Sequence, residues 1–355
     1  MDDLALNFIL SQFQVSLEDV TIQPINQGYI NDTFLIINAN KAEYILQQVN
    51  TNIFKNIEVL HQNFNKALIK LKDDEYQEIS LIKTQDNALF FEHKNTCWRL
   101  LTYINNSDAF NFTKDPIIAF EAGKILGKFH HLLRHENQDE YFDIIEKLNH
   151  LPSKIIEFEA ALANASFNRK ETAKNPIEFA LKNKNLFKAF YEADLPLRIC
   201  HNDTKLNNML FDKTSKKGLC LIDLDTIMIG YFHYDFGDAI RTVVSESNED
   251  EKELDKIKFN ISLFEKFIEG LKPYTSILSP KEIEYLPISC VLMPFMHGLR
   301  ALTDYLNGNI YYKVTYENQN LDRCKSLFEF TRLALLNQEL ITKLIKNSFN
   351  KSDQY

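Results

Sequence analysis

The chain has 355 residues, enough for two lobes that each bury a hydrophobic core. Its 45% hydrophobic and 25% charged residues are ordinary for a soluble globular protein, and its net charge of −9 argues against general binding to nucleic acid, whose phosphates attract a basic surface. The five cysteines are scattered without a CxxC pair, which argues against a zinc site or disulfide framework and fits a reducing cytoplasm.

No segment has the pattern of a membrane-directed sequence. Residues 1–8 lack a basic region followed by a long apolar run, so no signal peptide is indicated. Prolines and charged side chains interrupt residues 286–306, the most apolar stretch, which argues against a membrane span. The expected protein is a cytoplasmic monomer with neither a membrane nor a nucleic-acid partner.

The first hundred residues are predicted to be rich in strands. Apolar runs at 33–37 and 44–49 flank the turn-forming residues 38–41, which is the pattern of a β-hairpin. Apolar side chains three and four positions apart predict an amphipathic helix over 56–72. Two further strands are expected near 88–91 and 97–103.

The rest of the chain is predicted to be mainly helical. Asp115 followed by Pro116 is a helix start, and Ser279 with Glu282 has the form of a capping box. Other helices are expected at 175–191, 250–271 and 322–346. The prediction is an α+β protein with a strand-rich lobe (1–104), a polar hinge and a helical lobe (105–355), whose site lies in the cleft between them.

The most informative pattern lies between residues 199 and 226. It places His201, Asp203 and Asn208 as H-x-D-x-x-x-x-N, and an apolar run then leads to Asp223 and Asp225. This is the spacing of a kinase catalytic loop followed by a metal-binding strand. We expect Asp203 to accept the proton of an acceptor hydroxyl, while Asn208 and Asp223 offer the oxygen ligands that Mg²⁺ prefers. Single residues of this kind are common in turns, but the joint pattern predicts an ATP-dependent phosphotransferase.

Other polar residues near the motif have more than one interpretation. Asp225 is either a second Mg²⁺ ligand or a group that orients Asp223. Lys205 is placed to offset charge on the transferring phosphate, although a solvated lysine would look the same in sequence. His201 is expected to brace the loop, and Asp235 is interpreted as a brace or a helix cap.

Candidate nucleotide contacts lie in the first lobe. Gly28, Asn31 and Thr33 belong to a turn whose backbone N–H groups can cradle phosphates, although an ordinary hairpin turn fits equally well. The turn has a single glycine and no complete glycine-rich phosphate motif. Tyr103, at the hinge, is a further candidate for contact with ATP.

Polar and aromatic residues gather at 297–313, where the acceptor site is predicted. Arg300, Asp304, Tyr311 and Tyr312 are candidates to hydrogen-bond to a sugar and stack on its ring. A buried helix whose arginine extends its charged end to solvent is the alternative.

These motifs resemble the aminoglycoside phosphotransferase and choline kinase superfamily, whose members have a protein-kinase-like two-lobe fold. Residues 200–208, 222–228 and 234–241 look like the N-acetylhexosamine 1-kinases, as do 44–50 and 300–306. The resemblance implies magnesium-assisted transfer from ATP to the anomeric hydroxyl of N-acetylglucosamine or N-acetylgalactosamine.

The resemblance also bears on individual residues. It implies the roles of base and metal ligands given above, with Arg300, Tyr311 and Lys205 as candidates for sugar contacts. The lysine expected on the third strand falls at Gln47, whose amide can hydrogen-bond to a phosphate but brings no charge. The usual Lys–Glu pair, and with it any role for Glu58, is therefore in question.

Two other functions remain open at this point. A kinase of another small alcohol, such as choline, an aminoglycoside or homoserine, would share the catalytic motif; 15 tyrosines leave room for an aromatic cage around a quaternary ammonium. A non-catalytic nucleotide-binding regulator would explain Gln47 and the single glycine. Such a regulator has no need of a proton-accepting carboxylate beside two metal ligands.

Overall fold

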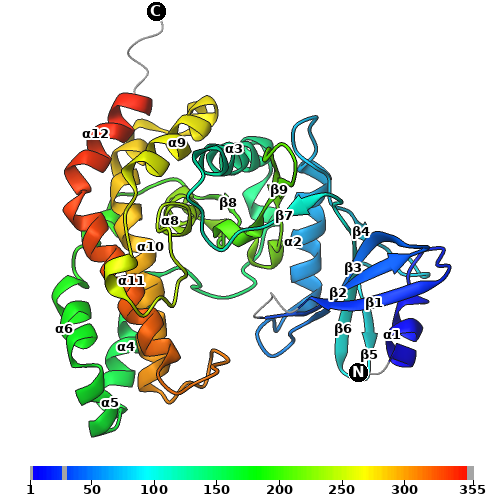
Figure 1. The fold of residues 1–355 in the computed structure, drawn as a ribbon, viewed down its shortest axis with the longest axis horizontal. Helices are drawn as coiled ribbons and strands as arrows, with labels where there is room; N and C mark the ends of the chain where they lie inside the picture. The colour runs from blue at the N-terminus through cyan, green and yellow to red at the C-terminus, as the bar shows by residue number, and fades with distance from the viewer. Residues whose placement is uncertain (1–2, 26–29, 350–355) are drawn as a thin grey trace, which may run out of the picture.

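The computed structural model describes residues 3–25 and 30–349, which form two lobes (Figure 1). A smaller lobe built on one large sheet is followed along the chain by a larger, mainly helical lobe. The predicted α+β architecture, strand-rich at the front and helical at the rear, is confirmed.

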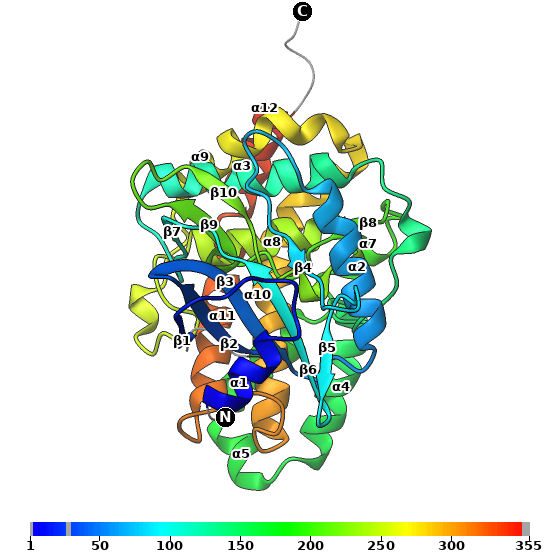
Figure 2. The ribbon, with the colours of Figure 1, turned by 90° about the vertical axis from the view of Figure 1, so that its right-hand side faces the viewer.

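The smaller lobe is a six-stranded antiparallel sheet in the order β1-β2-β3-β6-β4, with β5 also paired to β6. Helix α1 lies on the outer face of this sheet, where it packs with Trp98 and Leu100, and α2 lies on the side of the larger lobe (Figures 1 and 2). The elements are α1 (Asp3–Leu10), β1 (Val20–Ile25), β2 (Asp32–Asn38), β3 (Lys41–Val49), α2 (Ile57–Lys70), β4 (Leu81–Ile82), β5 (Phe91–His93) and β6 (Thr96–Thr102).

The predicted hairpin is confirmed as β2 and β3. Asn38 pairs with Lys41, so the turn consists of Ala39 and Asn40. Both turn residues have positive φ, 47° and 65°, as a two-residue hairpin turn with the twist of its strands requires. This register sets Gln47 of β3 directly opposite Arg99 of β6.

The larger lobe contains two short sheets surrounded by helices (Figure 1). Its strands are β7 (Ser107–Asp108), β8 (Arg198–Cys200), β9 (Met209–Asp212), β10 (Gly218–Leu221) and β11 (Met228–Gly230). Its α-helices are α3 (Pro116–Leu133), α4 (Leu151–Asn164), α5 (Phe167–Thr172), α6 (Lys174–Asn183), α7 (Lys188–Tyr191), α8 (Phe232–Val243), α9 (Ile261–Leu271), α10 (Pro280–Leu306), α11 (Gln319–Leu336) and α12 (Gln338–Phe349). Short 3-10 helices are η1 (Gln138–Glu140), η2 (Leu206–Asn208), η3 (Leu224–Thr226), η4 (Leu254–Lys256) and η5 (Lys272–Ile277).

Helix α10 is the centre of the larger lobe. It packs against α4, α8, α11 and α12. By length and composition it is the one helix among the described residues that could cross a membrane, but 83% of its apolar window is buried inside the fold. Burial to this extent is typical of a helix in the core of a folded protein. Pro287 and Pro294 lie within it, and the predicted capping box of Ser279 and Glu282 opens it.

Three predicted helices are shorter in the structure than the sequence suggested. The helix expected at 175–191 is divided into α6 and α7. The helix expected at 250–271 begins only at Ile261, because Asn260 caps it by accepting a hydrogen bond from the Leu263 N–H. The helix expected at 322–346 breaks at Asn337, between α11 and α12. The start predicted at Asp115 and Pro116 is confirmed.

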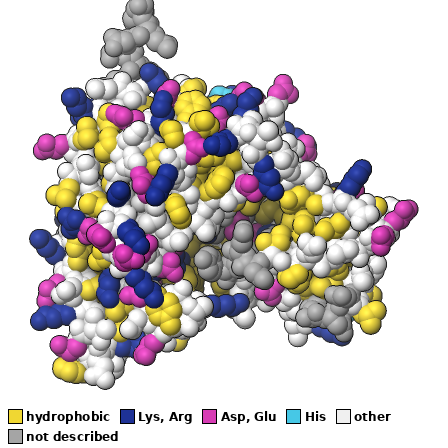
Figure 3. Space-filling model, viewed as in Figure 1, with side chains coloured by type: hydrophobic (Ala, Val, Ile, Leu, Met, Phe, Trp, Pro, Cys, Tyr) yellow, Lys and Arg dark blue, Asp and Glu magenta, His cyan; other side chains and the backbone are white. Residues whose placement is uncertain are grey.

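The lobes are joined directly after β6. The next strand, β7, pairs with β9 of the larger lobe, so the boundary predicted at residue 104 falls between β6 and β7. Figure 3 shows the surface indented between the two lobes. The residues of the H-x-D-x-x-x-x-N motif lie on the larger lobe's side of this junction, in the segment that leads from β8 to η2.

Candidate active site

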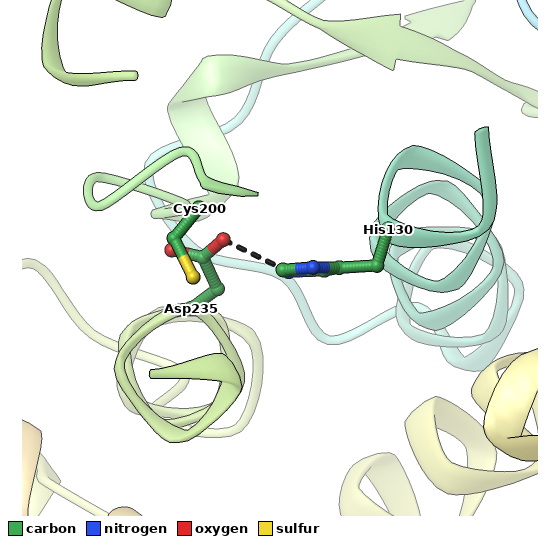
Figure 4. A group of neighbouring side chains, drawn as sticks. All are labelled: His130, Cys200 and Asp235. Carbon is green, nitrogen blue, oxygen red and sulfur yellow. Dashed lines mark hydrogen bonds and ion pairs between the residues drawn. The ribbon is translucent and has the colours of Figure 1, made fainter. Parts of the chain in front are cut away.

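Asp235 on α8 holds the catalytic loop in shape. Its Oδ2 accepts the His201 N–H at 2.8 Å, and its Oδ1 accepts the Asn202 N–H at 2.7 Å. His130 of α3 contacts the same carboxylate through Nε2 at 2.9 Å (Figure 4). The predicted brace is therefore confirmed. The predicted helix cap is wrong, because α8 starts at Phe232 and Asp235 lies inside its first turn.

His130, Cys200 and Asp235 are close enough to suggest a metal site, but their contacts indicate a structural cluster (Figure 4). Both oxygens of Asp235 already accept backbone N–H groups. Burial raises the pKa of the Cys200 thiol well above its usual value, which disfavours the thiolate that a metal needs.

His201 also braces the loop. Its Nε2 donates to the Ile222 carbonyl at 2.8 Å, and its Nδ1 accepts the Asp203 N–H at 3.3 Å. Both ring nitrogens are thus used, and His201 ties the loop to the end of β10. The predicted structural role of this histidine is confirmed.

Asp203 lies between two donors that bind one of its oxygens. Lys205 Nζ donates to Oδ2 at 2.8 Å, and Asn208 Nδ2 donates to the same atom at 3.0 Å. Oδ1 accepts no hydrogen bond from any described residue. Burial opposes the charge on Asp203, but Lys205 outweighs it and holds the pKa below its ordinary value. Asp203 therefore offers one ionised, unoccupied oxygen.

Asn208 and Asp223 present oxygens suited to a hard cation. The amide nitrogen of Asn208 is used by Asp203, so its amide oxygen is the atom left for a ligand. Asp223 follows β10 in the left-handed conformation, with φ 61°, and its carboxylate makes no hydrogen bond to the described residues. Burial, then Asp225, raises the pKa of Asp223 to about 6, and Asp203 also contributes. A cluster of carboxylates that destabilise one another fits the binding of Mg²⁺. The catalytic and metal-binding roles of these residues stay predictions.

Asp225 has other partners. It forms a buried ion pair with Arg99, and its Oδ2 accepts a hydrogen bond from Asn31 Nδ2 at 2.6 Å. Both oxygens are therefore occupied by residues of the smaller lobe. These contacts favour the second interpretation of Asp225, a group that positions the segment carrying Asp223, and its role stays a prediction.

Arg99 is a residue of this site that the sequence analysis missed. Its Nε donates to Gln47 Oε1 at 2.9 Å, and Gln47 in turn donates to Thr33 Oγ1 at 3.3 Å. The sequence feature that could have identified it is a single arginine within the otherwise largely apolar strand β6. Glu58 is exposed and accepts a hydrogen bond from Gln62, so it takes no part in this group.

The remaining nucleotide candidates lie around the same junction. Gly28 falls outside the described residues. Asn31 bridges Asp225 and the Asn50 N–H. Tyr103 follows β6 and hydrogen-bonds through its backbone N–H to the Glu43 carbonyl.

The predicted acceptor residues divide into two groups. Arg300 lies on α10; burial opposes its charge, but Tyr312, Tyr311 and Asp203 hold its pKa above the ordinary value. Asp304 instead braces the loop that follows α10, because its carboxylate accepts the N–H groups of residues 310, 311 and 312 at 2.9, 2.8 and 3.0 Å. We therefore correct Asp304 from a sugar contact to a residue that positions the two tyrosines.

A second charged group lies beside the loop. Arg241 donates to Asp238 at 2.6 Å and pairs with Glu249, which Arg323 also contacts at 2.6 Å. Burial opposes the charge on Glu249, but Arg323 and Arg241 lower its pKa to about 2. The acidic residues on this side of Asp203 are thus neutralised by arginines.

Comparisons with known proteins agree with this architecture. A sequence model of the phosphotransferase enzyme family (APH) matches residues 21–257. Among solved structures, a microcompartment-associated aminopropanol kinase superposes with a TM-score of 0.64 at 14% identity, covering 96% of this chain and 99% of that one.

Two further solved structures are also similar to this chain. Spectinomycin phosphotransferase, solved with ADP and spectinomycin, gives a TM-score of 0.63 at 12% identity over 97% of this chain and 99% of the other. A choline/ethanolamine kinase family protein from Mesorhizobium loti gives 0.57 at 16% identity over 97% and 99%. At such identities the likeness establishes the protein-kinase-like two-lobe fold alone. Together with the family match over two thirds of its length, it shows that the chain belongs to the phosphotransferase enzyme family.

Proposed function

We propose that this protein is an ATP-dependent small-molecule kinase that phosphorylates the anomeric hydroxyl of N-acetylhexosamines. The observation that carries the proposal is the unoccupied Oδ1 of Asp203, next to two oxygen ligands for Mg²⁺. A carboxylate in this state can accept a hydroxyl proton, which a module that only binds nucleotide does not require.

Each residue has a distinct task in direct in-line transfer. Asp203 Oδ1 hydrogen-bonds to the acceptor hydroxyl, orients it and takes its proton as the acceptor oxygen bonds to the γ-phosphorus of ATP and the bond from that phosphorus to the leaving ADP breaks. Asn208 and Asp223 would hold Mg²⁺, which would neutralise charge on the phosphates of ATP. Lys205 keeps Asp203 ionised and lies within reach of the transferring group, where a positive charge stabilises the transition state.

The charges around the acceptor position favour a neutral sugar over a cation. Arg300 acts electrostatically on Asp203, and Arg241 does so from α8. The carboxylates of Asp238 and Glu249 are already paired with arginines. A cationic acceptor such as choline needs an acidic or aromatic cage, whereas the hydroxyl and amide oxygens of an N-acetylhexosamine can accept hydrogen bonds from arginine.

A kinase of a small amino alcohol is the alternative with independent support. Two of the similar structures are an aminopropanol kinase and an ethanolamine kinase. The arginines beside Asp203 argue against this alternative, because they would repel an ammonium group.

An acceptor panel separates the possibilities. ADP formation with MgATP would be measured for N-acetylglucosamine, N-acetylgalactosamine, choline, ethanolamine, homoserine and an aminoglycoside, followed by phosphorus NMR of the product. We expect turnover with an N-acetylhexosamine and a phosphate attached at the anomeric carbon. Faster turnover with an amine-bearing acceptor would overturn the sugar assignment, and MgATP binding without turnover on any acceptor would favour a regulator.

A further inference from the structure

Strand β3 lacks the positive charge of the expected lysine, because Gln47 stands at that position, but the neighbouring strand β6 carries Arg99. Gln47 and Arg99 are directly paired across β3 and β6, so their side chains project from the same face of the sheet. This is the face on the side of α2, where Arg99 lies over the Phe64 ring with 4.6 Å between the guanidinium carbon and the ring centroid. The side chain of Arg99 is fully buried.

The hydrogen bonds of Arg99 leave one nitrogen unused. Nε binds Gln47, and Nη1 binds Asp225. Nη2 is buried and has no hydrogen-bond partner among residues 3–25 and 30–349. A buried guanidinium N–H group without an acceptor is costly, so its retention suggests that a ligand supplies the acceptor.

The location of Arg99 indicates what kind of ligand that is. Its guanidinium is paired with Asp225 of the larger lobe, in the short segment that also carries Asp223, the carboxylate proposed to hold Mg²⁺. Asp225, its ion-pair partner, is two residues from Asp223 and is also held by Asn31, which directly precedes β2 of the smaller lobe. An anion that extended from the proposed Mg²⁺ site to the sheet of the smaller lobe would pass Nη2 of Arg99.

We propose that Arg99 binds the phosphates of the nucleotide through Nη2, with Asp225 and Gln47 fixing the guanidinium in place. This inference rests on the proposed function for the identity of the anion, a nucleoside di- or triphosphate. Arg99 then supplies the positive charge that Gln47 cannot, and Asp225 serves as its acidic partner in place of a carboxylate on α2. The three-residue group Gln47–Arg99–Asp225 also joins the two lobes at the nucleotide.

The competing explanation is that Arg99 serves only as a counter-ion for Asp225. In that case the removal of either partner would have the same consequence, since each leaves the other charge buried and unpaired. Binding to phosphate predicts instead that the two variants differ. The test therefore compares Arg99→Gln/Asp225→Asn, which removes both charges and avoids an unpaired one, with Asp225→Asn alone.

Calorimetric binding of MgADP, MgATP and adenosine to the full chain, without acceptor, measures the difference. For the double variant we expect a loss of about 10- to 100-fold in affinity for MgADP and MgATP, the range of a charged hydrogen bond, with adenosine binding within about twofold of wild type. Asp225→Asn alone should lose clearly less MgADP affinity than the double variant, because Arg99 remains to bind the phosphates although its guanidinium is held less firmly. Adding Gln47→Lys to the double variant should recover part of the loss.

Two results would overturn the assignment. MgADP affinity of the folded double variant within about twofold of wild type would mean that Arg99 does not bind phosphate. An equal loss in Asp225→Asn and in the double variant would identify Arg99 as a counter-ion only. The binding measurements contain no acceptor, so they can be interpreted whether or not the protein phosphorylates anything. A wild-type protein that binds MgATP but phosphorylates no acceptor would contradict the proposed function, while the assignment of Arg99 could still be tested. Failure of the wild type to bind MgATP would overturn both.

Discussion

At the scale of single residues, the acidic side chains of the candidate site differ in how many hydrogen-bond donors occupy their oxygens. Asp203 keeps Oδ1 unoccupied, whereas Asp225, Asp235 and Asp304 have their oxygens occupied by neighbouring donors. The four carboxylates look alike in sequence and differ only in these contacts. The free oxygen is the reason that we propose Asp203, and not the other three, as the proton acceptor.

Lys205 gives the first prediction at this scale. Lys205→Ala removes the cation bound to Asp203 Oδ2 and a charge near the transferring phosphate, so we expect kcat to fall by about 10²-fold, the effect typical of one stabilising group. Steady-state ADP formation at saturating MgATP measures it. Lys205→Arg should recover part of the rate. Lys213→Ala is the matched control on the turn after β9, and an equal loss there would contradict the assignment.

At the scale of elements, the loop after α10 is held in place by Asp304, a residue near the C-terminal end of that helix. Asp304 accepts three backbone N–H groups from it and also binds Asn320 Nδ2 at 2.8 Å, which fixes the segment to α11. Tyr311 remains exposed on this segment, at 52% of its surface. The loop is therefore held by its base, with Tyr311 exposed and Tyr312 half-buried against Arg323.

Asp304→Asn tests that arrangement. An amide offers one oxygen where the carboxylate offers two, so part of the loop is released. We expect the acceptor KM to rise by about tenfold, equivalent to about 1.4 kcal/mol, while the KM for MgATP is unchanged. An increase in both constants, or in neither, would show that the loop does not bind the acceptor.

His233 on α8 gives the stability of the larger lobe a dependence on pH. Burial lowers its pKa from 6.5 to about 4; Nε2 donates to the Glu282 carbonyl, and Nδ1 is buried with no partner in the part of the chain that the structure describes. Between these two pKa values the unfolded chain binds a proton that the folded protein does not, so stability falls as pH decreases from about 6.5 to about 4.

Chemical denaturation of His233→Gln at pH 7 and pH 4 checks this prediction. The wild type should lose on the order of 3 kcal/mol more than the variant over that range, because glutamine does not titrate. An identical pH dependence of the two proteins would mean that His233 is not the titrating group.

At the scale of the whole molecule, the sequence was most informative where the signal is local. Hairpin turns, caps and the catalytic motif are encoded in neighbouring residues, and the corresponding elements are present. Asp203 and Asn208 could be named together because a single loop carries both.

What could not be predicted depends on contacts between distant segments. Arg99 and Asp225 are 126 positions apart, and their ion pair follows from strand register and from how the lobes meet. The helix breaks near residues 184–187 and at Asn337 also had weak local signals, since neither contains glycine or proline. Tertiary packing decided these features.

The central claim is that Asp203, Asn208 and Asp223 form one phosphoryl-transfer centre between the lobes. The most direct measurement is acceptor-dependent ADP formation by wild type and Asp203→Asn, with and without Mg²⁺, alongside calorimetric binding of MgATP and with exposed Asp255→Asn as the control. We predict turnover only for wild type and the control, only with Mg²⁺, and a loss of about 10²- to 10⁴-fold in Asp203→Asn with MgATP affinity unchanged. Near-normal turnover by Asp203→Asn, or turnover by wild type that does not require a divalent cation, would contradict the claim.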